Sequence, residues 1–87
     1  MAANRTLYLI TCDLRGAIDY QPFLEELRQR LQAKEILRSQ WVVGSSLDPM
    51  EIRDRLRTHL GPEDGLLIVE IGRWASDNTF VNINEVD

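Results

Sequence analysis

The chain has 87 residues and a formal net charge of −4, with 44% hydrophobic and 28% charged residues. This composition is typical of one small globular domain; it excludes a disordered chain, and no apolar run approaches the length of a bilayer span, so we expect no membrane partner. The acidic balance gives no overall attraction to phosphates, and the apolar run near the N-terminus is too short for a secretory signal, so we expect a cytosolic protein.

Residues 7–13, with the sequence Leu-Tyr-Leu-Ile-Thr-Cys-Asp, form the first clear element. An apolar run with β-branched and aromatic members and polar flanks predicts a strand buried on both faces, at the centre of a sheet. Cys12, the only cysteine, is expected to pack as a small apolar side chain. Asp13 closes the strand, where a side chain is held rigidly near solvent, and is therefore the first candidate for chemistry.

A first helix is expected over residues 22–32. Pro22 suits its first turn, and apolar side chains recur at helical spacing at Phe23, Leu24, Leu27 and Leu31. Residues 34–46 have strand composition, and their length favours two short strands with a reversal near residues 38–40. Because that reversal contains no Gly, Asn or Pro, one long bent strand is the alternative.

The second helix has the best-marked boundaries. Asp48 and Glu51 have the spacing of a capping box around Pro49 at the first helical position, and the Gly-Pro pair at residues 61–62 ends the helix. His59, the only imidazole, falls in the last turn. We expect it at the rim of the core, where a cation also suits the helix dipole.

Another apolar strand is expected over residues 66–71. It is followed by a tail, residues 73–87, in which residues 81–84 alternate as an edge strand would. The order strand, helix, strand, strand, helix, strand predicts an α+β fold: a ferredoxin-like βαββαβ sandwich with two helices on one face of an antiparallel sheet. We expect a single domain over residues 1–87 with its core in residues 6–72.

Both faces of this sheet are predicted to be apolar, because both alternating sets of side chains in residues 7–12 and 66–71 are largely hydrophobic. Two helices cover one face only, and a face exposed to water normally alternates with polar residues. We therefore expect a second copy to cover the other face, in a two-fold homodimer.

Cationic side chains supply candidate contacts to nucleic acid. Arg53 and Arg57 share one face of the second helix, with Arg55 opposite. Arg28 belongs to a second basic group, with Arg30, Lys34 and Arg38. Such side chains hold phosphates without reading the base sequence. The other interpretation is a solvated surface, because neighbouring carboxylates largely neutralise these charges.

Asp13 is the candidate metal ligand. Magnesium is bound by one or two carboxylates with water completing its octahedron, and a two-fold axis could bring the Asp13 carboxylates of two copies together. The structural alternative is that Asp13 accepts backbone N–H groups from the turn at residues 14–17, as Asp commonly does in loops.

Several segments together resemble one known family. They are Leu-Ile-Thr-Cys-Asp13, Asp19-Tyr20, Ser39-Gln-Trp41, Ile52-Arg-Asp-Arg-Leu56 and Asp64-Gly-Leu-Leu-Ile-Val. In this order they look like the small CRISPR-associated "Cas-two" proteins and their VapD-like relatives. The resemblance implies a ferredoxin-like homodimer in which Asp13 faces its symmetry mate across a cleft.

Two activities are described in that family. One is metal-dependent cleavage of RNA or DNA, which here would use Mg²⁺ at Asp13 with Ser39 in a supporting role; the VapD branch comprises toxin ribonucleases. The other is a non-catalytic scaffold that holds an integrase and its DNA. The protein partner would accordingly be an integrase or an antitoxin.

Two further functions fit the residues. The chain could be a catalytically silent dimeric adaptor that binds a protein partner through its sheet edge or tail. It could also be a small-ligand regulatory domain, since domains of this fold bind ligands at sheet edges in dimers.

Overall fold

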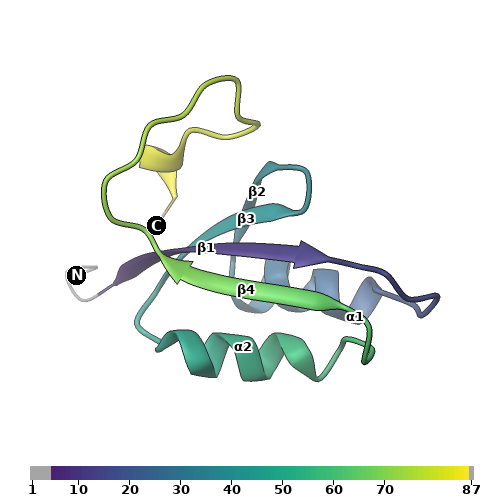
Figure 1. The fold of residues 1–87 in the computed structure, drawn as a ribbon. Coiled ribbons are helices and arrows are strands. Elements are labelled where there is room, and N and C mark those ends of the chain that lie inside the picture. Colours follow the sequence, from purple (N-terminus) through teal and green to yellow (C-terminus); the bar gives the residue numbers. More distant parts are fainter. Residues whose placement is uncertain (1–4, 87) are drawn as a thin grey trace.

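The computed structural model describes residues 5–86 (Figure 1). The elements are β1 (Thr6–Asp13), α1 (Gln21–Glu25), a π-helical segment (Glu26–Arg30), β2 (Lys34–Leu37), β3 (Gln40–Ser45), α2 (Pro49–Arg57), β4 (Gly65–Glu70) and a 3-10 helix (Ile83–Glu85). The strands form one antiparallel sheet in the order β2-β3-β1-β4, with both helices on one face. The predicted α+β fold of the ferredoxin-like type is confirmed. Within residues 5–86, no helix has the length and apolar character needed to cross a membrane.

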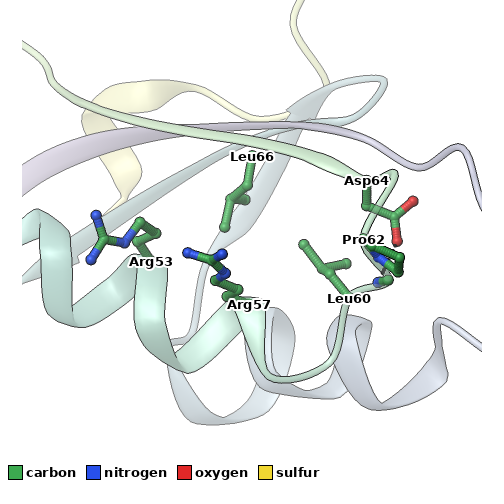
Figure 2. A pocket seen from close by; sticks show the side chains of 7 residues that line it. Arg53, Arg57, Leu60, Pro62, Asp64 and Leu66 are labelled. Atoms are coloured by element: carbon green, nitrogen blue, oxygen red, sulfur yellow. Dashed lines mark hydrogen bonds between the residues drawn. The ribbon is translucent and has the colours of Figure 1, made fainter.

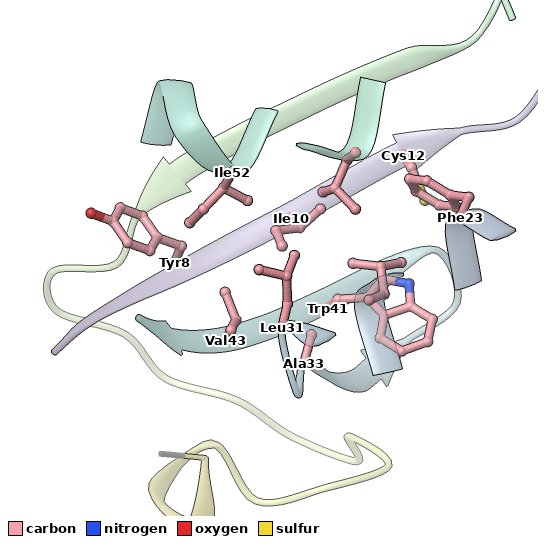
Figure 3. Close-up of a cluster of buried hydrophobic side chains, with 11 residues drawn as sticks. Tyr8, Ile10, Cys12, Phe23, Leu31, Ala33, Trp41, Val43 and Ile52 are labelled. Atoms are coloured by element: carbon pink, nitrogen blue, oxygen red, sulfur yellow. The ribbon is translucent and has the colours of Figure 1, made fainter. Parts of the chain in front are cut away.

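β1 is the central strand, since it pairs with β3 on one side and with β4 on the other. Its even-numbered side chains, Tyr8, Ile10 and Cys12, point towards the helices and are buried there with Trp41 of β3 (Figure 3). Fully burying a side chain such as Ile10 contributes about 1.5–3 kcal/mol. The main core therefore lies between the sheet and the helices.

The predicted start of α2 is confirmed. An Asp48 carboxylate oxygen accepts the N–H of Met50 at 2.8 Å, and the Glu51 carboxylate accepts the N–H of Asp48 at 3.1 Å. These two contacts complete the capping box, which satisfies N–H groups that have no partner inside the helix.

The first helix begins at Gln21, and its second half is π-helical as far as Arg30. It ends because Gln32 adopts a φ of 58°. The buried carboxylate of Glu26 accepts Arg30 Nη1 at 3.0 Å and lies 3.3 Å from His59 Nε2. His59 lies at the rim of the core, as predicted, but in the turn after α2 and not in the last turn of the helix.

Residues 34–46 form two strands, so the alternative of one long bent strand is wrong. The chain reverses at Arg38 and Ser39, and Ser39 takes the positive φ of 60° that this turn requires. The Glu35 carboxylate accepts the Ser39 N–H at 3.3 Å, which helps to hold a turn without Gly or Asn.

The expected edge strand at residues 81–84 is also wrong. The tail instead crosses the face of the sheet away from the helices, where Ile83 and Val86 are buried against Ile36 and Val42 (Figure 1). The Phe80 N–H donates to Ile36 O at 2.8 Å, and this bond ties the tail to β2. The chain therefore covers part of the second apolar face itself.

The other half of that face stays open. Leu67 and Val69 of β4 point away from the helices, because they pair with Thr11 and Leu9 on β1. Their exposed fractions are 57% and 39%. The expectation that a partner covers this face is therefore restricted to the part beside β4.

Candidate functional site

Asp13 lies at the end of β1, opposite Gly65 on β4. Its side chain is 69% exposed, and its carboxylate accepts Arg15 Nε at 2.9 Å. An ion pair between exposed side chains contributes at most about 1 kcal/mol. The carboxylate is therefore accessible to a ligand or a partner.

The turn after Asp13 is held by a different carboxylate, that of Asp64. One of its oxygens accepts the N–H groups of Arg15 at 2.7 Å and Gly16 at 3.1 Å and the hydroxyl of Tyr20 at 2.6 Å. Its other oxygen accepts the Gly61 N–H at 2.8 Å. The structural alternative, in which Asp13 accepts the N–H groups of this turn, is wrong, because Asp64 accepts those of Arg15 and Gly16.

These bonds to the ionised carboxylate, the one from Tyr20 foremost, lower the pKa of Asp64 to about 2. The pKa of Tyr20 is raised, first because its hydroxyl is desolvated and then because it donates to Asp64. Sequence reasoning placed Asp64 in a turn and missed this role. The available signal was an Asp directly before Gly65 in a loop that follows a helix.

The carboxylates at the predicted magnesium site do not belong to a larger cluster of metal-ligating side chains within the described residues. Asp64 uses its acceptor positions on four donors, whereas Asp13 has only the exposed Arg15 side chain against it and stays accessible. A site of the expected kind would need the Asp13 of a second copy.

Ser39 lies at the same end of the sheet, on the side of β1 away from Asp64. Its carbonyl oxygen accepts the N–H of Cys12 at 3.1 Å and the Cys12 thiol at 3.6 Å. Ser39 is therefore next to the residue that precedes Asp13. Burial raises the pKa of the Cys12 thiol, which agrees with its predicted packing role.

Arg53 and Arg57 lie together, as predicted, in a groove of about 280 Å³ between α2 and β4 (Figure 2). Leu66 of β4 and Asp64 line the same groove. Arg53 donates twice to its neighbour Asp54, at 3.0 and 2.9 Å. Arg57 has no ion pair or hydrogen bond to the side chains of the described residues.

A second hollow of about 200 Å³ continues this groove along β4. Met50 and Arg53 of α2 line it together with Leu66, Leu67 and Ile68. The two hollows share Arg53 and Leu66, so one groove runs beside residues 66–68 of β4.

Arg28 does not line this groove. Its guanidinium lies 5.3 Å from the ring centre of Trp41, a cation–π contact at the surface of the core. Of the three predicted phosphate contacts, the structure thus brings Arg53 and Arg57 together and leaves Arg28 on another element.

Comparison of the chain with models of known families, with curated proteins and with solved structures finds no match. The fold itself hosts many functions, so a functional argument has to start from the residues of the site. Those residues are the accessible Asp13 and the arginine-lined groove beside β4.

Proposed function

We propose that this chain works in the cytoplasm as a homodimer that engages RNA or DNA as a binding scaffold, the non-catalytic activity implied by its resemblance to the Cas-two-like family. The observation that carries the proposal is the open groove lined by Arg53 and Arg57. Both guanidiniums reach the surface from one face of α2, and a guanidinium binds phosphate oxygens in bidentate fashion.

Local charge permits this binding in an acidic protein. Phosphate contacts depend on cations that lie close together, whereas the net charge of −4 is a sum over the whole chain. The bonds from Arg53 to Asp54 join two exposed side chains, so a phosphate can replace the carboxylate at small cost. Within the described residues of one chain, Arg57 has no carboxylate partner to exchange.

The test compares Arg53→Ala with Arg55→Ala by fluorescence anisotropy on labelled single-stranded RNA and duplex DNA over a range of salt concentrations. We expect Arg53→Ala to weaken binding and to lower the slope of log affinity against log salt by about 1, the effect of one lost phosphate contact. Arg55 is the matched control, because it is an exposed arginine of α2 that does not line the groove. Equal binding curves for the two variants would contradict the proposal.

Metal-dependent cleavage of nucleic acid is the second candidate. The observation that favours it is the accessible Asp13 carboxylate, with only exposed Arg15 against it. This candidate requires two Asp13 side chains from two copies to meet, as the resemblance to the Cas-two-like family implies.

A further inference from the structure

The outer edge of β4 has no strand beside it in the described part of the chain. The Ile71 N–H donates to Leu7 O at 2.9 Å, so the backbone groups of odd-numbered β4 residues turn towards β1. Because these groups alternate along a strand, the N–H and C=O groups of Leu66, Ile68 and Glu70 face outwards. Such an edge is a template for another strand, and β4 contains neither Pro nor Lys to block it.

Apolar side chains lie beside these open backbone groups. Leu67 and Val69 are exposed on the sheet face away from the helices, next to the same edge. Met50 of α2 is also exposed and lies in the groove below. A partner strand on this edge would therefore gain apolar contacts in addition to backbone hydrogen bonds.

Two charged side chains without an ion pair in the described residues, Glu70 and Arg57, favour a second copy of the chain as that partner. Neither Glu70 nor Arg57 has an ion pair within residues 5–86, and they belong to opposite ends of β4, since Arg57 shares its groove with Leu66. Antiparallel pairing of two β4 strands about a two-fold axis at Ile68 sets Glu70 opposite the partner's Leu66. Glu70 then lies on the helix side, within reach of the partner's Arg57.

The register follows from the same residues. With the axis at Ile68, Leu67 faces the partner's Val69 and all three outward-facing residues find a partner. Moving the axis to Leu67 would set Glu70 opposite the partner's Asp64, and like charges directly opposite each other are destabilising. Moving it to Val69 would carry Glu70 away from the end of the groove where Arg57 lies.

We propose that two copies of this chain pair their β4 strands antiparallel about Ile68, with Glu70 of each copy bound to the partner's Arg57. One continuous sheet then runs through both copies, with all helices on one face. The proposal deepens the scaffold function by defining its homodimer: Arg57 then pairs with Glu70 across the interface, and Arg53 of each copy is the groove arginine that remains for phosphate, on one surface of the dimer. With standard strand spacing and rise, the two Asp13 carboxylates lie roughly 25 Å apart in this dimer, too far to share one ion.

The experiment is a charge swap between copies, read as molar mass by size-exclusion chromatography with light scattering at micromolar concentration and without nucleic acid. The wild-type chain should have twice the 10.1 kDa mass of the monomer. Glu70→Arg alone and Arg57→Glu alone set like charges together, so each should weaken the dimer by about tenfold or more. An equimolar mixture of the two variants should recover the dimer, because both contacts are then between opposite charges.

The controls are Glu63→Arg and Arg55→Glu, which reverse exposed charges outside the predicted contact and should leave the mass unchanged. Circular dichroism verifies that every variant is folded. A monomeric wild type, which would leave the edge to a foreign strand, overturns the proposal, and so does a mixture that stays monomeric. Because no nucleic acid is present, either failure is distinct from a failure of RNA or DNA binding.

Discussion

At the scale of single residues, two aspartates at one end of the sheet have the two roles that the sequence analysis considered for Asp13 alone. Asp64 holds the turn after β1, and Asp13 is accessible to a ligand. Asp64 joins the loop after β1 to the loop before β4, since it binds Gly16 and Tyr20 on one side and Gly61 on the other. Asp13 is left exposed. The half-buried carboxylate is therefore structural, and the accessible one is the candidate for function.

The Asp64 network predicts a pH-dependent stability. The folded-state pKa of about 2 is below the ordinary 3.8, so the stabilisation is complete above pH 3.8 and is lost as the pH falls through 2. Asp64→Asn removes this linkage. We expect the gap in unfolding free energy between wild type and Asp64→Asn to be largest near neutral pH and to narrow below pH 3.8, in urea titrations at several pH values.

Glu63→Gln is the matched control, because Glu63 is the exposed carboxylate next to Asp64. The difference in unfolding free energy between Glu63→Gln and the wild type should be small at every pH. A constant gap for Asp64→Asn would show that Asp64 acts in some way other than as an ionised acceptor.

At the scale of elements, prediction succeeded where local chemistry determines structure. Asp48 and Pro49 fixed the start of α2, and the apolar run that ends at Asp13 fixed the central strand. The prediction for the tail failed because an alternation of Val or Ile with Asn is compatible with both an edge strand and a 3-10 turn. Asn82 accepts the N–H of Asn84 at 3.0 Å, a local bond that favours the 3-10 turn over an edge strand.

The docked tail is predicted to contribute to global stability. Ile83→Ala leaves a cavity against Ile36 and Val42 and should cost about 2–5 kcal/mol in urea unfolding. Phe80→Ala is the control within the tail: Phe80 is 63% exposed, so its substitution should cost no more than about 0.5 kcal/mol. A cost for Ile83→Ala as small as the one expected for Phe80→Ala would mean that the tail does not pack on the sheet in solution.

At the scale of the whole molecule, the tail changes what the apolar second face implies. The sequence pattern indicated a bare face, whereas the chain covers the β2 and β3 half with its own residues. The part of this face that stays exposed, at Leu67 and Val69, lies at the outer edge of the sheet. The proposed contact between two β4 edges depends on where Glu70 and Arg57 lie relative to each other. No pattern along the chain contains that relation, because it arises only when α2 packs beside β4.

The same reasoning decides between the two candidate functions. If two copies meet at β4, their Asp13 side chains stay apart. Asp13→Ala should then leave the dimer mass and the affinity for RNA and DNA unchanged. Asp77→Ala, which removes an exposed carboxylate of the tail, is the control and should also leave both unchanged. Wild-type protein should then degrade labelled RNA and DNA no faster with Mg²⁺ than with EDTA, as measured on denaturing gels. Magnesium-dependent cleavage that Asp13→Ala abolishes, and Asp77→Ala does not, would establish the nuclease and contradict the β4 dimer together, because a shared ion needs both carboxylates within a few ångströms of each other.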